Sequence, residues 1–316
     1  MANKLLILGN GFDIDLGLKT KYSDFAKSPY WDELMKNVFE EVSHDLLTVL
    51  KEAQKTETWF DIEQVMYDYV TSLSRYGYNV SEDKKEFEKL LEALIQYLDS
   101  VQKKHTYNNK SIAYRVLKEM VENGSTKIYT FNYTSVQQLS DYFHLEINAS
   151  AITHVHGALD NKSIILGILA DPSVSIKEEY SFMYKDNSRF YMSNNMYEDF
   201  DKAKEIVFFG HSINGMDFPY FKDFFIKQSG MDGDYKRKSI TIFTFDDDSD
   251  IQIRNSIRRA MVDLTQLFRR NSIQFIQTKR LYDYDEVEMD KFNAFIAKMN
   301  SDRGIITVNH NDPFGW

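Results

Sequence analysis

Four short polar motifs in this chain each end or follow a run of aliphatic or aromatic residues, and together they could bind a nucleotide. Glycines let the backbone approach a phosphate, amides and hydroxyls can bind a ribose, and histidine can accept a proton near neutral pH. Ligands of open α/β sheets bind beyond the carboxyl ends of the strands, so four such ends would meet in one crevice. The motifs are Gly9-Asn10-Gly11-Phe12-Asp13, Thr130-Phe131-Asn132-Tyr133-Thr134, His154-Val155-His156-Gly157 and the segment from Gly210 to Asp217.

The first motif follows the run LLIL and matches the start of a dinucleotide-binding unit, in which a glycine turn leads from a strand into a helix. We expect Gly9, Asn10 and Gly11 to hold phosphate, with Phe12 and Asp13 in the same binding turn. The fingerprint is incomplete, because its third glycine is missing. The alternative interpretation of the two glycines is an ordinary strand-to-helix turn.

The second and third motifs supply the two candidates for catalysis, Asn132 and His156. The amide of Asn132 can bind a water or ribose hydroxyls, and the alternative is that Asn132 caps a helix beginning near Ser135. His156 can accept a proton from a hydroxyl or from water. His154 and His156 alternate along an expected strand and so share a face, and the alternative for one of them is a structural role.

Further binding candidates come from the same strand ends: they are Thr130, Gly157, Gly210, His211, Ser212 and Asp217. We expect Ser212 and Asp217 to contact ribose or to position their loop. Ser212 does not fit the nucleophile elbow of serine hydrolases, because Gly-x-Ser-x-Gly requires a glycine where the chain has Asn214. Asp61 and Glu63 lie in helical sequence, where a solvated or capping role is the default.

The elements that would position these motifs are short, nearly continuous hydrophobic runs, which are typical of strands covered on both faces of a parallel sheet. Between the first two runs lies a long helical stretch, clearest over 86–104, where apolar residues recur at helical spacing. The sequence therefore predicts an α/β fold with a Rossmann-like, mostly parallel sheet and a large helical insertion. The expected strands are 4–8, 127–131, 152–156, 163–168, 205–209, 239–245 and 273–277.

The same pattern predicts the domain organisation. Residues 1–29 and 123–300 form a discontinuous α/β domain, 30–122 form the helical insertion, and 301–316 form a tail. A single crossover helix would not need so long an interval. Within the α/β domain, helices are expected over about 250–270 and 285–299.

Composition narrows the classes of function. The chain has 316 residues and a formal net charge of −10, which argues against direct binding of nucleic acid. It has no cysteine, which excludes disulfides, thiolate zinc sites and a cysteine nucleophile. No apolar run approaches the length of a membrane span, so we expect a cytoplasmic protein that does not bind membranes.

The motifs also resemble a known family. The run GNGFDIDLGLKTKYSDF, the segment WFDIE at 59–63 and the later FNYT, HVHG and GHSI segments are similar to the bacterial phage abortive-infection AbiH family. The constellation is in turn similar to the sirtuin-like NAD-binding fold. That resemblance implies that Gly9 and Gly11 hold the pyrophosphate and that Asn132 faces the nicotinamide ribose. It also implies that His156, with Gly157, is the catalytic base and that Gly210 and Ser212 contact the ribose-phosphate portion.

The function that this resemblance implies is an NAD+ glycohydrolase, which cleaves NAD+ to nicotinamide and ADP-ribose in antiphage abortive infection. NAD+ is thus the expected ligand or substrate, and no metal is expected. Hydrolysis is favoured over deacylation, because deacylase sirtuins carry a cysteine-built zinc module and this chain has no cysteine. Constant loss of NAD+ would be toxic, so we expect control by a homo-oligomer, an activating subunit or a phage component.

Two other functions stay open. The same pocket could sense a nucleotide without turnover. Alternatively, the His-x-His pair, with His211 and a carboxylate such as Asp13 or Asp217, could form the site of a metal-dependent hydrolase. The resemblance also makes Asp61 and Glu63 possible site residues.

Overall fold

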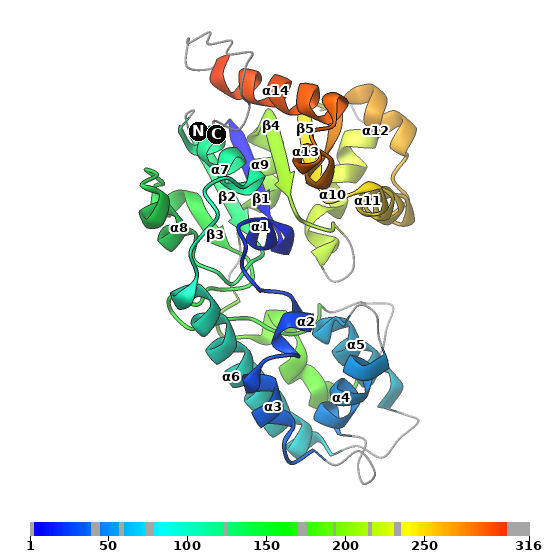
Figure 1. Cartoon of the computed structure of the whole chain (residues 1–316). Coiled ribbons are helices and arrows are strands. Elements are labelled where there is room, and N and C mark those ends of the chain that lie inside the picture. Colours follow the sequence, from blue (N-terminus) through cyan, green and yellow to red (C-terminus); the bar gives the residue numbers. More distant parts are fainter. Residues whose placement is uncertain are drawn as a thin grey trace. The chain divides into compact units, whose positions relative to one another are not determined.

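The computed structural model describes residues 3–38, 45–56, 60–73, 79–122, 125–169, 176–191, 194–213, 217–230 and 235–301 (Figure 1). The chain divides into two compact units. The sheet unit comprises Met1–Gly17, Thr106–Val155 and Asn194–Trp316. The helical unit comprises Leu18–His105 and His156–Ser193.

The sheet unit contains six strands in one sheet, in the order β3-β2-β1-β4-β5-β6, and every neighbouring pair is parallel. Chain order reverses between β1 and β4, which is the switch point where doubly wound sheets bind ligands. The predicted α/β, Rossmann-like fold with a helical insertion is confirmed. The strands are β1 Lys4–Leu8, β2 Thr126–Thr130, β3 Ile152–His154, β4 Glu205–Phe209, β5 Ser239–Thr244 and β6 Ser272–Gln277.

Register brings the predicted motifs to one edge of this sheet. Leu8, at the end of β1, lies beside Thr130 of β2 and Phe209 of β4. The polar residues that follow these three positions therefore emerge at the same carboxyl edge. All five residues of β1 are buried, as the continuous hydrophobic run indicated.

Helices cover both faces of the sheet. On one face, Phe208 packs with Phe200 of α9 and Phe221 of α10. On the other, Phe243 of β5 stacks on Phe209 and contacts Phe295 of α14. The helices of the sheet unit are α1 Asn10–Asp15, α7 Ile112–Glu122, α8 Val136–Phe143, the 3-10 helix η2 Ala149–Ala151, α9 Met196–Lys202, α10 Pro219–Ser229, α11 Asp247–Arg259, α12 Leu264–Arg270, α13 Thr278–Tyr282 and α14 Glu286–Ser301.

The helical unit is built around α6, whose apolar residues Phe87, Leu90, Leu94 and Leu98 are buried at the predicted helical spacing. Among the described helices, none is both long enough and apolar enough to cross a lipid bilayer. The helices of this unit are α2 Tyr22–Phe25, α3 Pro29–Met35, α4 Leu46–Thr56, α5 Ile62–Ser72, α6 Val80–Lys104 and the 3-10 helices η3 Glu178–Met183 and η4 Lys185–Asn187.

The units differ in their bounds from the domains that the sequence predicts. Helix α7 lies within the predicted insertion, yet it belongs to the sheet unit. The reason is local: Asp15 accepts a hydrogen bond from the Ala113 N–H at 2.7 Å, and the Tyr282 hydroxyl accepts one from the Ile112 N–H at 3.1 Å. These bonds satisfy two N–H groups at the start of α7 that no helical partner can reach.

Conversely, 156–193 belongs to the helical unit. The Tyr180 hydroxyl of this segment donates to the buried Asp83 carboxylate on α6, which also accepts from Tyr69 at 2.9 Å. A buried carboxylate that two distant hydroxyls satisfy holds both segments against α6.

Three predicted elements differ in detail. The strand expected over 163–168 is buried but irregular, and in it only Ile168 forms a bridge, with Tyr184. The helix expected over about 250–270 is two helices, because Met261 adopts a φ of +63° and Asp263 then caps α12. The strand expected over 152–156 ends at His154, so His156 follows it in a turn. The predicted tail beyond Ser301 lies outside the described residues.

Candidate functional site

Asn132 is fixed where β2 ends. Its backbone N–H donates to the Oγ1 of Thr130 at 3.1 Å, and its side-chain Nδ2 donates to the Gly9 carbonyl at 3.0 Å and to Asp13 Oδ1 at 2.8 Å. The Gly9 carbonyl can only accept, so the amide nitrogen must face it. Both amide hydrogens are therefore used, and the Oδ1 of Asn132 is the group that can accept from a ligand. The cap of α8 is Ser135, not Asn132.

Asp13 is the centre of this network. Its side chain is 1 % exposed, and its second oxygen accepts from the Thr134 hydroxyl at 2.8 Å. Burial raises the pKa of Asp13 to about 7, and the hydrogen bonds from Thr134 and Asn132 oppose that shift. A buried carboxyl group that titrates near neutral pH is a frequent property of functional sites. We define Gly9, Asp13, Asn132 and Thr134 as the Asp13 network.

The glycines of the first motif lie against the turn that follows β4. A Cβ added to Gly11 would lie 2.6 Å from the Gly210 Cα, and one added to Gly9 would lie 2.5 Å from the His211 Cα. The Gly11 N–H donates to the Gly210 carbonyl at 2.9 Å. The Gly9 and Phe12 N–H groups also donate to protein carbonyls. Close packing of two turns at the switch point accounts for these glycines, and phosphate binding by the turn stays a prediction.

We expect Gly210→Ala to lower the free energy of unfolding by about 2–4 kcal/mol. Gly210 has a φ of +62°, and an added Cβ would lie 2.4 Å from the backbone carbon of Gly11, which cannot move without displacing α1. Urea unfolding would measure the loss. Gly230→Ala is the matched control, because Gly230 has an ordinary φ of −71°. An equal loss in both variants would contradict the packing argument.

His211 follows Gly210 and is buried. Its Nδ1 accepts from the Ile213 N–H at 2.9 Å, so the neutral ring carries its hydrogen on Nε2, which lies 3.8 Å from Asp217 Oδ2. The ring contacts Phe131 edge-on, with centroids 4.4 Å apart. Ser212, in contrast, is exposed, and residues 214–216 of this motif lie outside the described residues.

His156 belongs to the helical unit, in a second polar cluster that we call the Lys185 cluster: Glu63, His156 and Lys185. The fully buried Lys185 Nζ donates to Glu63 Oε2 at 2.9 Å and lies 3.4 Å from His156 Nε2. An ammonium group can only donate, so Nε2 is the accepting nitrogen and the ring hydrogen lies on Nδ1. Gly157 makes the turn after His156: its φ is +75°, and a Cβ there would meet the Ser163 carbonyl oxygen at 1.8 Å.

The structure thus brings the candidates together in two sets. The first set is the Asp13 network, in which Gly9 follows β1 and Asn132 follows β2. Thr130, Gly210 and His211 lie at the same edge of the sheet. The second is the Lys185 cluster, with Gly157. Joint action of Asn132 and His156 stays a prediction.

Three residues gain roles that sequence reasoning missed or left open. Thr134 lies in the FNYT segment, which resembles the AbiH family, but the resemblance implied no role for this residue. Lys185 carries no signal in the sequence, because its partner Glu63 precedes it by more than a hundred residues. Glu63 is buried in an ion pair rather than solvated, whereas Asp61 does cap α5 through the Glu63 and Gln64 N–H groups. Among the described residues, no three His, Asp or Glu side chains gather so that they could hold a metal ion.

The chain matches a known protein family. Residues 5–234 match the family model described as Bacteriophage abortive infection AbiH. The matched range contains every candidate residue named above. No protein with a curated description matches the chain.

Proposed function

Because the chain belongs to the bacteriophage abortive infection AbiH family, we propose that it acts in phage defence as an NAD+ glycohydrolase. The observation that carries the proposal is the Asp13 network. Asn132 is held by two hydrogen bonds at the carboxyl edge of a parallel sheet, beside the switch point between β1 and β4. Nucleotide ligands of this fold class bind at that position.

The network fixes what Asn132 can do for a ligand. Its Nδ2 is occupied by Gly9 and Asp13, so Oδ1 accepts a hydrogen bond from a ribose hydroxyl or from a water. Since the Gly9, Gly11 and Phe12 amides donate within the protein, we assign recognition in this region to side chains. Asp13 positions Asn132 and does not itself face solvent.

Cleavage of NAD+ does not require a strong general acid. The bond from the ribose to nicotinamide already has a cationic leaving group, so its cleavage needs a stabilised oxocarbenium-like sugar and a placed water. Water adds to the ribose carbon, nicotinamide departs with the bonding electrons, and the proton of the water goes to a base. We assign that base to His156, whose Nε2 can accept the proton once Lys185 Nζ, 3.4 Å away, withdraws its hydrogen bond. Until then Lys185, which is ion-paired with Glu63, keeps the ring hydrogen of His156 on Nδ1.

The test is release of nicotinamide from NAD+ by the purified protein, followed by chromatography, with NAD+ binding measured in parallel. We expect Asn132→Ala and His156→Ala each to lower turnover roughly 100-fold or more. The matched controls are Asn148→Ala, which removes an exposed cap of η2, and His105→Ala at the end of α6. Both should keep turnover.

The outcomes separate the proposal from its rivals. Turnover in the controls and its loss in both site variants would support the glycohydrolase. Binding of NAD+ that Asn132→Ala weakens, without any turnover, would support a nucleotide sensor instead. Neither binding nor turnover, including in the presence of phage extract as an activator, would exclude NAD+ as the ligand. A Thr134→Val variant, which removes one bond to Asp13 and leaves Asn132 in place, should lose less turnover than Asn132→Ala.

The proposal also includes control of the activity. Hydrolysis of NAD+ by an uninfected cell would be toxic, so we expect the activity to depend on self-assembly, an activating subunit or a phage component. We place the activity in the cytoplasm, where NAD+ is available, and we propose no metal requirement. Addition of a chelator should therefore leave turnover unchanged.

A further inference from the structure

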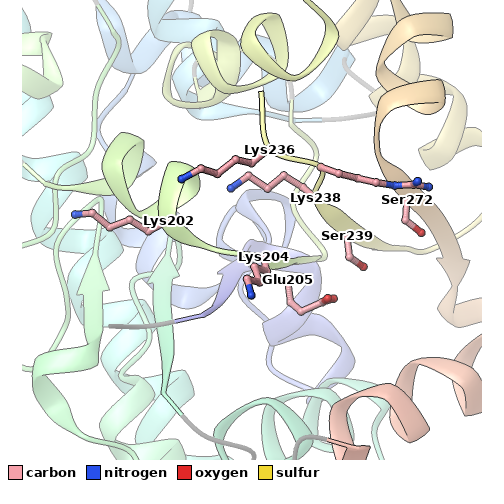
Figure 2. A pocket seen from close by; sticks show the side chains of 8 residues that line it. Lys202, Lys204, Glu205, Lys236, Lys238, Ser239 and Ser272 are labelled. Atoms are coloured by element: carbon pink, nitrogen blue, oxygen red, sulfur yellow. The ribbon is translucent and has the colours of Figure 1, made fainter. Parts of the chain in front are cut away.

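A basic hollow lies at the opposite edge of the sheet from the Asp13 network. It has a volume of about 630 Å³, and Glu205, Ser239 and Ser272, the first residues of β4, β5 and β6, line it (Figure 2). Ligands of doubly wound sheets bind at the carboxyl ends, so this fold class does not by itself account for a site here. Its cationic lining residues are Lys202, Lys204, Lys236, Arg237 and Lys238.

Positive charge gathers here in a chain whose net charge is −10. Three carboxylates that the structure describes around the hollow are already paired with lysines. Glu205 accepts from Lys298 at 2.6 Å, and Glu198 accepts from Lys202 at 2.9 Å. Asp201 pairs with Lys227 at 2.5 Å. The remaining lining cations are therefore not balanced by these three carboxylates.

Two of the lining cations already have partners in the protein, and among the described residues the other three form no ion pair. Lys202 is paired, and the buried Lys238 donates to the backbone carbonyls of Asp201 and Ala203 at the end of α9, at 2.6 Å each. A cation suits a helix C-terminus. Lys204, Lys236 and Arg237 are exposed, and within the described part of the chain their side chains form no ion pair. These three side chains can bind a ligand.

The charges are also crowded. Burial lowers the pKa of Lys238, Asp201 opposes that shift, and the charges of Lys236 and Lys227 add to it. Figure 2 shows the Lys236 and Lys238 side chains extending in the same direction. Like charges repel, and an anion bound by Lys236 would reduce the repulsion that Lys238 experiences. The Ser272 hydroxyl, which also lines the hollow, can donate to an anion there.

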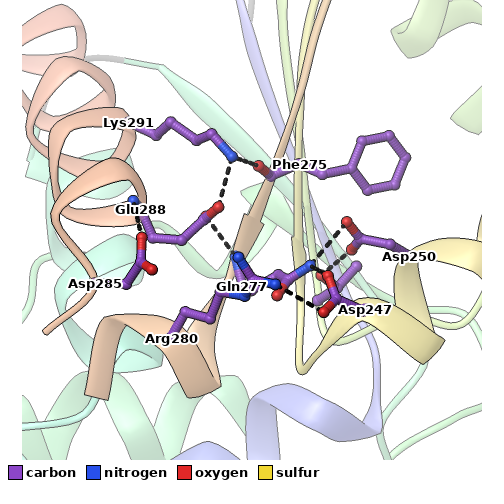
Figure 3. A network of polar contacts seen from close by, with 9 residues as sticks. Asp247, Asp250, Phe275, Gln277, Arg280, Asp285, Glu288 and Lys291 are labelled. Atoms are coloured by element: carbon purple, nitrogen blue, oxygen red, sulfur yellow. Dashed lines mark hydrogen bonds and ion pairs between the residues drawn. The ribbon is translucent and has the colours of Figure 1, made fainter. Parts of the chain in front are cut away.

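A second charged cluster of the sheet unit shows the contrast (Figure 3). There Gln277 Nε2 donates to Asp247 at 2.8 Å and to Asp250 at 3.1 Å, and Arg280 donates to Asp247 at 2.7 Å. Glu288 accepts from Lys291 at 2.5 Å. The carboxylates in that cluster are matched by donors, so it needs no ligand. In the part of the chain that the structure describes, Lys204, Lys236 and Arg237 have no such carboxylate partners.

We propose that the basic hollow is an anion site that binds a compact polyphosphate through Lys204, Lys236, Arg237 and the Ser272 hydroxyl. A compact ligand fits better than a nucleic acid. An extended polyanion would run past the hollow over a molecule with a net charge of −10, which repels it. A phosphate chain within the hollow meets five cationic side chains and one carboxylate, Glu205, which Lys298 already pairs. The site does not depend on the proposed NAD+ chemistry.

Inorganic triphosphate is the probe, and isothermal titration calorimetry of the whole protein at low salt is the measurement. We expect wild type to bind triphosphate, with an affinity that falls as salt is raised. The variant Lys204→Gln/Lys236→Gln/Arg237→Gln should bind it more weakly by roughly tenfold or more. Because all three side chains are exposed, the variant should keep its fold, which circular dichroism would check.

The charge-matched control is Lys84→Gln/Lys85→Gln/Lys89→Gln on α6, which removes three exposed positive charges from the helical unit. It should bind triphosphate as wild type does. Asn132→Ala should also bind it normally, because it changes only the Asp13 network. The proposal is overturned if wild type does not bind, if the control loses as much affinity as the hollow variant, or if Asn132→Ala alone abolishes binding. Tighter binding of a single-stranded oligonucleotide through the same three residues would overturn the compact ligand.

Discussion

Lys185→Met is expected to lower the free energy of unfolding by about 3–5 kcal/mol. Lys185 is fully buried, and its ammonium group lies 2.9 Å from Glu63 Oε2. Methionine fills similar space but leaves the Glu63 carboxylate buried without its cation. The cost of an uncompensated buried charge exceeds what the pair itself contributes. Urea unfolding monitored by circular dichroism would measure the loss.

Two further variants decide whether that loss is electrostatic. Glu63→Gln combined with Lys185→Met removes both charges and should recover much of the stability. Lys103→Met breaks an ion pair with Asp99 in which the Lys103 side chain is 70 % exposed and the Asp99 side chain 47 %. It should lower the free energy of unfolding by well under about 1 kcal/mol. If the double variant is no more stable than Lys185→Met, lost packing around the lysine stem is the cause instead.

Asp13→Asn is expected to gain stability relative to wild type as pH rises. Burial raises the pKa of Asp13 to about 7 from the unfolded value of 3.8, so the folded protein favours the protonated carboxyl group. Wild type therefore loses stability between about pH 4 and about pH 7, as the unfolded chain releases a proton that the folded chain retains. Asparagine does not ionise. The difference in unfolding free energy should shift by about 4 kcal/mol across this window and stay constant outside it.

The experiment compares urea unfolding of wild type and Asp13→Asn at several pH values. The contributions of other titrating groups cancel in the difference between the two free energies of unfolding. Asp248→Asn is the matched control, because that side chain is exposed on α11. Its difference from wild type should change far less with pH. A constant difference between Asp13→Asn and wild type would contradict the raised pKa, because Asp13 would then release its proton at the same pH in the folded and the unfolded chain.

The sequence predicts those parts of the structure whose pattern lies within a short stretch of residues. The strand β1 is recognisable because burial on both faces requires every residue from Leu5 to Leu8 to be apolar, and parallel register then brings Thr130 and Phe209 to the same edge. Convergence of Asn132 with the first motif follows from that register. The buried irregular segment around Ile165 is as apolar as a strand, and hydrophobicity alone cannot separate the two.

What the sequence does not predict are contacts between distant polar side chains. The orientation of Asn132 depends on Asp13, which the motif suggested as a ligand contact and not as its hydrogen-bond partner. Nothing in the sequence distinguishes Lys185 from the other lysines, because its contact with Glu63 appears only in the structure. Helix α7 has the same amphipathic pattern as its neighbours in the chain. Its hydrogen bonds to Asp15 and Tyr282, and its packing against α1 and α14, place it in the sheet unit.

The strand order β3-β2-β1-β4-β5-β6 also determines how long each strand waits for its neighbour during synthesis on the ribosome. β1 lies between β2 and β4, yet Phe209, the partner of Leu8 in β4, is made about two hundred residues after it. At typical translation rates the apolar β1 waits on the order of 10–40 s for that neighbour. Such non-local pairing folds slowly and exposes strand edges meanwhile. The nascent chain should therefore depend on a chaperone until β4 has emerged.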